Sequence, residues 1–188
     1  MRILGVSGSL RTGSFNTKLL HAAQELLLPD VALELYAGLQ DVPPYDEDAD
    51  RDPPPAAVAA FRAALADADA ILFATPEYNH SIPGHLKNAI DWASRPLATN
   101  PLRNKPVAVV GASTGMFGAV WSQAELRKVL RACGARVLES GVAVGGAPGR
   151  FDEEGRLTDP ALRAELGEVL YELVGEAVPV PAAAPVAA

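Results

Sequence analysis

The chain has almost no cysteine and no long hydrophobic run. Cys133 is the single cysteine among 188 residues. This excludes an internal disulfide and a cysteine-held iron–sulfur cluster, and it is typical of the reducing cytosol. No apolar run approaches the ~20 residues of a membrane-spanning helix. The N-terminus carries a single basic residue, Arg2, and continues directly into a predicted strand, so it does not resemble a secretory signal. We therefore expect a cytoplasmic protein without membrane association.

Positive charge is also scarce. The chain has 16 Lys and Arg against 23 Asp and Glu, a formal net charge of −7, and no basic run. Because phosphate contacts dominate nucleic-acid binding, we expect no nucleic-acid partner. No Cys/His cluster has the spacing of a metal site, so we also expect no metal. The composition is 49% hydrophobic and 21% charged, which is typical of a soluble globular domain.

Residues 5–16 are rich in glycine and hydroxyl side chains directly after a short apolar run. They read Gly-Val-Ser-Gly-Ser-Leu-Arg-Thr-Gly-Ser-Phe-Asn, and a helical pattern follows. The unpaired N–H groups and the dipole at a helix N-terminus attract anions, and Arg11 adds a charged donor. The Walker loop and the three-glycine dinucleotide fingerprint are absent, which favours a monophosphate such as that of FMN. An ordinary serine-rich turn is the alternative.

Short apolar runs alternate with helical patterns along the chain. This alternation predicts an α/β protein with a five-stranded, doubly wound parallel sheet in a flavodoxin-like three-layer fold. One domain is expected over residues 1–176, followed by an Ala/Pro-rich disordered tail over 177–188. The Asp- and Pro-rich stretch 41–55 is expected to be an exposed loop without regular structure. The expected strands are 2–7, 31–36, 70–74, 106–112 and one within 137–144; the expected helices are 17–28, 56–67, 82–93, 119–132 and 160–174.

In such folds the ligand lies beyond the carboxyl ends of the strands, so the loops after the first, third and fourth strands should bind it. The third-strand loop, 75–84, has two prolines and one large aromatic residue, Tyr78, among hydrogen-bonding side chains. The fourth-strand loop, 111–118, has three glycines and two hydroxyls. Each loop alone is also compatible with a plain turn, but all three together favour a ligand site.

Two longer segments carry recognisable motifs: Gly8-Ser9-Leu10-Arg11 with Ser14-Phe15-Asn16, and Pro76-Glu77-Tyr78-Asn79 with Pro83-Gly84-x-Leu86-Lys87-Asn88-Ala89-Ile90-Asp91-Trp92. In these the chain resembles the NADPH-dependent FMN reductase family, whose members include bacterial quinone, chromate and azo-dye reductases. The resemblance extends over about residues 1–175. It implies one non-covalent FMN per subunit, NADPH or NADH as co-substrate, and a homodimer or homotetramer.

By position, the resemblance also implies the cofactor contacts. The phosphate and ribityl end of FMN would be held by Ser9, Arg11, Ser14, Phe15 and Asn16. The isoalloxazine would be lined by Pro76, Glu77, Tyr78 and Asn79. Ser113, Gly115 and Gly118 would approach the ring from the fourth-strand loop.

The activity implied is ping-pong hydride transfer from the nicotinamide through FMN to a small-molecule acceptor such as a quinone, chromate or an azo compound. No catalytic side chain is expected, because the flavin supplies the chemistry. Arg95 is either a contact for a nicotinamide-nucleotide phosphate or a surface cation. His80 is either a general acid or a packing group. Helix 82–93 lies near the subunit interface in the family, or it buries its apolar stripe within its own chain.

A flavodoxin-like electron carrier is the main alternative function, since an acidic chain suits basic protein partners. The Arg- and Ser-containing phosphate loop, in place of the Thr-rich loop of carriers, argues against it. A scaffold that has lost its cofactor is a further alternative, and the intact residues in all three loops argue against that.

Overall fold

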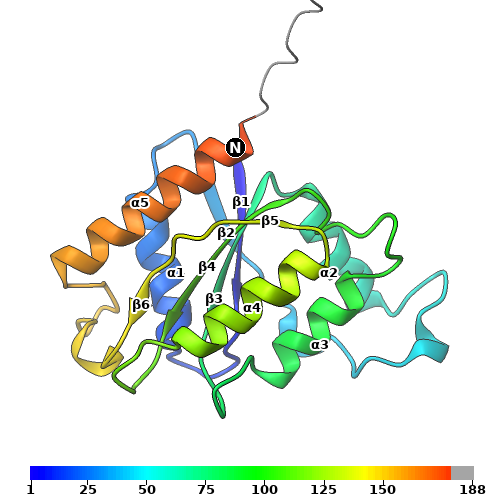
Figure 1. Ribbon diagram of the computed structural model, residues 1–188, viewed down its shortest axis with the longest axis horizontal. Helices are drawn as coiled ribbons and strands as arrows, with labels where there is room; N and C mark the ends of the chain where they lie inside the picture. The colour runs from blue at the N-terminus through cyan, green and yellow to red at the C-terminus, as the bar shows by residue number, and fades with distance from the viewer. Residues whose placement is uncertain (179–188) are drawn as a thin grey trace, which may run out of the picture.

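A parallel sheet forms the middle layer of the computed structural model, which describes residues 1–178 (Figure 1). The strands lie in the order β2-β1-β3-β4-β5, and β6 also pairs with β4. This is the doubly wound order of flavodoxin-like proteins, so the predicted fold class is confirmed. Of the predicted tail, residues 177–188, the part from residue 179 onward lies outside the described residues. The strands are β1 (Arg2–Ser7), β2 (Ala32–Leu35), β3 (Ala70–Thr75), β4 (Pro106–Ala112), β5 (Arg136–Val137) and β6 (Ala143–Val144).

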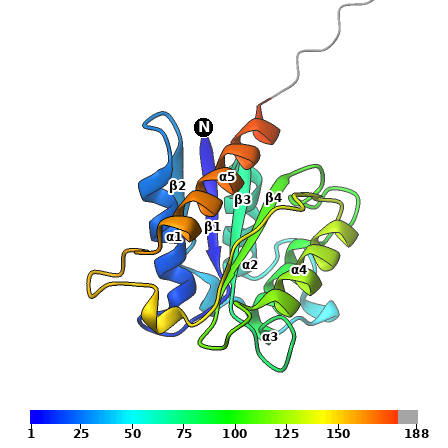
Figure 2. The ribbon, with the colours of Figure 1, turned by 60° about the vertical axis from the view of Figure 1, so that its left-hand side comes forward.

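The helices cover both faces of the sheet: α1 and α5 lie on one face, and α2, α3 and α4 lie on the other (Figures 1 and 2). Strands β3 and β4 are buried along their whole length, as their continuous apolar runs require. A hydrophobic core therefore forms on each side of the sheet. The helices are α1 (Phe15–Leu26), α2 (Ala56–Asp67), α3 (Gly84–Ala93), α4 (Val120–Ala132) and α5 (Pro160–Ala177). None of those described is long and apolar enough to cross a bilayer.

The strand register brings three loops to one edge of the sheet. Ser7 at the end of β1 pairs with Ala74 of β3, and Thr75 at the end of β3 pairs with Gly111 of β4. The chain therefore leaves all three strands at nearly the same height. The loops 8–14, 76–83 and 113–119 begin side by side at this carboxyl edge.

The expected fifth strand is interrupted. Strand β5 covers only Arg136–Val137 and β6 only Ala143–Val144. Between them the Leu138 N–H donates to the Val107 carbonyl and the Gly111 N–H to the Val142 carbonyl, both at 2.9 Å, but the ladder is incomplete. The guanidinium of Arg127 on α4 bonds to both sides of this interruption. Its Nη2 donates to the carbonyl oxygens of Val109, at 3.0 Å, and Ser140, at 3.4 Å, and so replaces the missing strand pairing.

The prediction that residues 41–55 contain no regular structure is wrong in part. A 3₁₀ turn, η2, spans Glu47–Ala49, and the loop is tied to α3. The Pro43 carbonyl accepts hydrogen bonds from Asn88 Nδ2 and Trp92 Nε1, both at 2.8 Å, while the Tyr45 N–H donates to Asn88 Oδ1 at 2.7 Å. Local composition shows the prolines and aspartates of the loop but not the helix side chains that hold it.

The apolar stripe of α3 is buried in the chain's own core. Leu86, Ala89, Ile90 and Ala93 are at most 1% exposed, and Trp92 is fully buried beside them. Of the two alternatives for this helix, the stripe therefore serves the core rather than a subunit interface.

Candidate functional site

The loops after β1, β3 and β4 meet in one pocket with a volume of about 140 Å³. Most of the residues expected to contact a cofactor line it, and Asn79, Gly115 and Gly118 do not. Ala112 and Thr114, which the sequence did not single out, complete the wall. The expected residues that the structure brings together are Ser9, Arg11, Ser14, Phe15, Asn16, Pro76, Glu77, Tyr78 and Ser113.

The loop after β1 presents backbone donors to the pocket. Ser14 is the N-cap of α1, and its hydroxyl accepts the Thr17 N–H at 3.3 Å. Among the described residues, no acceptor takes the N–H groups of Phe15 and Asn16, which lie at the open end of the helix. Donors so placed bind anions. Arg11 folds over this loop and donates to the Gly13 carbonyl at 3.1 Å.

Asn16 is a buried clasp between α1 and β4. Its Nδ2 donates to the Ala112 carbonyl and its Oδ1 accepts the Ala112 N–H, both at 2.9 Å. The side chain is only 2% exposed. Asn16 therefore holds the first loop against the end of β4, a role that sequence reasoning missed.

Glu77 connects the third-strand loop to α4. Its Oε2 accepts the backbone N–H groups of Trp121, at 3.0 Å, and Ser122, at 3.1 Å. Helix α4 has no N-cap side chain of its own, because Ala119 stands at that position in a left-handed conformation. The Glu77 carboxylate therefore caps α4 from another loop, where the helix dipole also favours negative charge.

Asn79 and His80 form the tip of a tight turn. Both have positive φ angles, 52° and 58°, and the N–H and carbonyl groups of Tyr78 and Ser81 bond each other across the turn at 3.1 and 3.0 Å. Two consecutive left-handed residues are typical of a type I′ hairpin turn. The turn carries Asn79 past the pocket wall, while His80 Nδ1 lies 3.4 Å from Glu77 Oε1.

The two glycines outside the pocket wall contact the segment that contains β6, and Gly118 is the one that requires a glycine. Gly118 has a φ of 59°, and a Cβ there would lie 2.4 Å from the carbonyl carbon of Ala143. The Gly115 carbonyl accepts the Gly146 N–H at 2.9 Å. Both positions therefore hold the fourth-strand loop against the segment that contains β6.

Aromatic side chains extend from the pocket over the start of α4. Trp121 makes edge-on contacts with His80 and Phe117, with ring centroids 4.7 and 5.1 Å apart. Tyr78 and Phe117 are more than half exposed, and Met116 beside them is 82% exposed. This part of the site is an apolar surface open to solvent.

His85 lies behind the first loop. Its Nε2 is buried without a hydrogen-bond partner among the described residues. Burial lowers the pKa of His85, although the Gly8 backbone opposes this shift. The ring is therefore neutral at pH 7 and packs against the loop that begins at Gly8.

The structure places Arg95 away from this pocket. Arg95 follows α3, at the end remote from the third-strand loop, and its Nε lies 3.5 Å from Asp50 Oδ2. The same aspartate pairs with Arg62 at 3.0 Å. Arg95 thus belongs to a separate depression, which Arg51 and Asp52 also line.

A larger depression of about 600 Å³ lies at the opposite, amino-terminal edge of the sheet. Two of its three cations are engaged in the fold: Lys105 Nζ donates to the Ala66 carbonyl at 3.0 Å, and Arg136 pairs with Glu176 at 2.9 Å. Within residues 1–178, no cluster of three or more His, Cys, Asp or Glu side chains is arranged to hold a metal.

The doubly wound sheet, with a hydroxyl- and Arg-containing loop at its carboxyl edge, defines a flavodoxin-like α/β protein. Residues 1–149 match the family described as NADPH-dependent FMN reductase. The chain belongs to this family, as its motifs predicted.

Named relatives cover nearly the whole chain. An NAD(P)H-dependent FMN reductase of Pseudomonas aeruginosa is 44% identical over 174 residues, which is 92% of this chain and 93% of the relative. A quinone reductase of Pseudomonas putida is 40% identical over 155 residues, or 82% of this chain and 83% of the relative. The solved structure of FerB, a flavoenzyme NAD(P)H:(acceptor) oxidoreductase from Paracoccus denitrificans, matches with a TM-score of 0.85 and 33% identity, covering 94% of this chain and 96% of that one.

Proposed function

We propose that this chain transfers electrons from NADPH or NADH through bound FMN to quinones, with chromate and azo compounds as further acceptors. One observation carries the proposal: three loops of an FMN reductase family member form one pocket, with anion-binding chemistry at one end and aromatic side chains at the other. The names of the relatives, a quinone reductase among them, support the acceptor class.

The phosphate end of the pocket consists of Ser9, Arg11, Ser14, Phe15 and Asn16. The Ser9 and Ser14 hydroxyls, the Arg11 guanidinium and the open N–H groups of α1 are all donors, and together they fit a phosphate dianion. A Cβ on Gly8 would lie 2.8 Å from Leu86 Cδ2 and 3.2 Å from Pro76 Cδ, so glycine lets the loop pack close to the wall. These residues bind and orient the FMN phosphate.

The ring end consists of Pro76, Glu77, Tyr78 and Ser113. When bound there, FMN supplies hydride-transfer chemistry that no side chain of this chain provides. The Tyr78 N–H is taken by the Ser81 carbonyl, while no acceptor takes the Glu77 N–H among the described residues, so the Glu77 backbone can donate to the ring. The pocket is open to solvent at this end, where Tyr78 is 53% exposed. Donor and acceptor can therefore reach the ring in turn, which favours ping-pong kinetics.

We further propose a cytoplasmic homodimer or homotetramer whose subunits pack beside the ring end and leave the ring accessible to reactants. The exposed apolar side chains of Tyr78, Met116, Phe117 and Trp121 form a surface of the kind that subunits bury. Light scattering coupled to gel filtration measures the assembly directly. A stable monomer at micromolar concentration would contradict this part of the proposal.

The activity is tested by anaerobic stopped-flow of the FMN-loaded protein against NADPH and NADH, followed by a second mix with a benzoquinone. We expect rapid loss of the flavin's visible absorbance with at least one nucleotide and its return with the quinone. Loss of absorbance with a one-electron chemical reductant but with neither nucleotide would contradict the proposal and favour an electron carrier.

A further inference from the structure

The segment between η3 (Ala147–Gly149) and α5 forms a short hairpin, which we call the strap (residues 150–159). Phe151 and Leu157 pair across it as an antiparallel bridge, and Gly155, with a φ of 84°, makes the turn. The strap begins where the match to the family model ends, at residue 149. Nothing assigned so far to the pocket depends on it.

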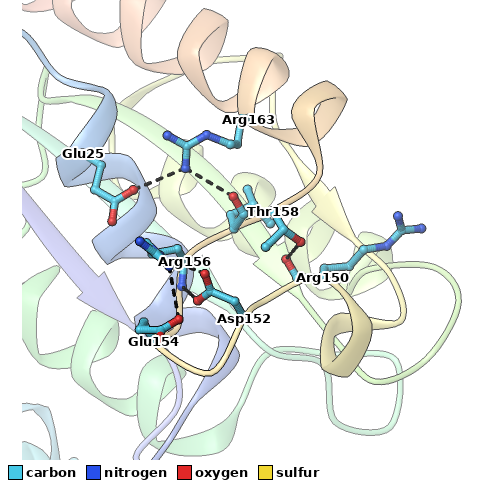
Figure 3. A network of polar contacts seen from close by, with 8 residues as sticks. Glu25, Arg150, Asp152, Glu154, Arg156, Thr158 and Arg163 are labelled. Carbon is cyan, nitrogen blue, oxygen red and sulfur yellow. Dashed lines mark hydrogen bonds and ion pairs between the residues drawn. The ribbon is translucent and has the colours of Figure 1, made fainter.

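The strap is closed by an ion pair between Asp152 and Arg156. Asp152 accepts the Arg156 backbone N–H and the Arg156 Nε, both at 2.8 Å, on its two carboxylate oxygens. Arg156 Nη2 also donates to Glu154 at 3.2 Å (Figure 3). The pKa of Asp152 is lowered, and the hydrogen bond from the Arg156 backbone N–H is the largest cause. Asp152 is therefore ionised at neutral pH, and the ion pair persists.

The strap is also anchored to two helices and to the core. Arg150 pairs with Asp159, the N-cap of α5, at 2.6 Å. Arg163 of α5 donates to Glu25 of α1 at 3.3 Å and to the Leu157 carbonyl at 3.2 Å (Figure 3). Leu157 is only 1% exposed in the core beneath α1 and α5. The strap therefore has a fixed position relative to α1.

The position of the strap brings Phe151 to the phosphate end of the pocket. The Phe151 ring stacks on Phe15, with ring centroids 5.8 Å apart and an interplanar angle of 26°. The same Phe15 ring carries the Arg11 guanidinium at 5.3 Å and the Lys18 ammonium at 5.7 Å from its centroid. Phe15 is thus a shared support for one aromatic ring and two cations.

The two cations lie near the N-terminus of α1, where the helix dipole is unfavourable for positive charge. Arg11 and Lys18 flank the N-terminus of α1, whose first turn holds no acidic residue. The positive end of the helix dipole destabilises nearby cations, and a bound anion reverses this effect. The contacts with the Phe15 ring hold the cations in place for such an anion.

We propose that Phe151 is a positioning residue for the FMN phosphate: the strap presses its ring against Phe15, and this fixes the Arg11 guanidinium at the pocket. The inference rests on the assignment of the phosphate end made under the proposed function. It adds a residue far along the chain that acts on the cofactor through Phe15 and does not touch it.

The test compares FMN with riboflavin, which lacks the phosphate. The full-length protein is freed of flavin and titrated with each ligand by flavin fluorescence, and the ratio of the two affinities measures the phosphate contribution. We expect Phe151→Ala to lower this ratio about three- to tenfold, the worth of an aromatic pair, with riboflavin affinity unchanged. Phe151→Leu keeps most of the apolar side chain without the aromatic ring, and it should lower the ratio by a smaller amount.

Two further variants separate the possible failures. Tyr171→Ala makes a comparable truncation at an aromatic residue of α5 that is 84% exposed, and it should leave the ratio unchanged. Arg11→Ala should lower the ratio about ten- to a hundredfold, the worth of a charged hydrogen bond. If Arg11→Ala lowers the ratio while both Phe151 variants leave it unchanged, or weaken FMN and riboflavin equally, the inference about Phe151 is wrong. If Arg11→Ala itself leaves the ratio unchanged, the assignment of the phosphate end is wrong.

Discussion

The phosphate end of the pocket contains a buried anchor at Asn16, whereas the ring end carries an exposed aromatic side chain at Tyr78. Asn16 at the phosphate end is 2% exposed and bonded on both sides of its amide, while Tyr78 at the ring end is 53% exposed. The difference separates two tasks. A cofactor that stays bound needs a rigid anchor, and reactants that come and go at its ring need an accessible surface.

The largest expected effect of a single change is at the Asn16 clasp. Asn16→Ala leaves the buried N–H and carbonyl of Ala112 without partners, and each costs about 1–3 kcal/mol. Urea unfolding followed by tryptophan fluorescence should show this loss together with weaker FMN binding. Asn16→Asp still accepts the N–H, but it places a buried carboxylate oxygen against the Ala112 carbonyl, so its loss should be at least as large. An Asn16→Ala protein within about 0.5 kcal/mol of wild type, the usual range for a surface change, would refute the clasp.

The next effect is expected at the ring end, where the Glu77 carboxylate accepts the backbone N–H groups of Trp121 and Ser122. Glu77→Ala removes the cap of α4 and should cost about 1–2 kcal/mol of unfolding free energy. Glu77→Gln keeps an oxygen acceptor but loses the charge, so a loss of about 0.5 kcal/mol is expected. The same urea experiment on Glu153→Ala, at an exposed glutamate of the strap, gives the control. Equal stability of Glu77→Ala and Glu153→Ala would mean that α4 does not depend on this carboxylate.

The third effect is a pH dependence of stability at the phosphate end. Burial lowers the pKa of His85 behind the first loop, so the unfolded chain binds a proton more readily than the folded one. Stability from this residue is therefore present above its unfolded pKa of about 6.5 and is lost as pH falls below it. His85→Gln should lose less stability than wild type between pH 7.5 and pH 5.5. His21→Gln, at an exposed position of α1, is the matched control, and identical losses in wild type and His85→Gln would exclude this role.

The smallest effect on stability is expected at Tyr78. Because this side chain is largely exposed, Tyr78→Ala should change the unfolding free energy by less than about 0.5 kcal/mol. The KM for a quinone should nevertheless rise severalfold, because an aromatic surface at the ring end is lost. Steady-state kinetics at saturating NADPH measure this, with Tyr171→Ala as the control. An unchanged KM would mean that acceptors do not contact Tyr78.

The sequence predicted the sheet and the meeting of three loops at its carboxyl edge because both follow from local patterns. Continuous apolar runs predicted β3 and β4, and the carboxyl-edge rule for such sheets pointed to three loops. Helix boundaries were less accurate: α1 begins at Phe15 because Ser14 caps it, and α5 continues to Ala177.

The missed features are contacts between distant parts of the chain. The Asn16 clasp joins residues 96 positions apart, and the Glu77 cap joins residues 44 positions apart. The stacking of Phe151 on Phe15 is of the same kind. Neither residue type nor spacing shows which backbone group or ring a side chain meets after folding, so such roles need the three-dimensional arrangement.

The interruption of the fifth strand also affects how the sheet meets other molecules. An open sheet edge with unpaired backbone groups invites pairing with strands of other chains, and short or covered edges prevent this. Here β5 and β6 offer two residues each, while the guanidinium of Arg127 and the bond from Ser140 Oγ to Glu172 occupy the space between them. The same irregularity that breaks the strand therefore protects this border of the sheet against edge-to-edge aggregation.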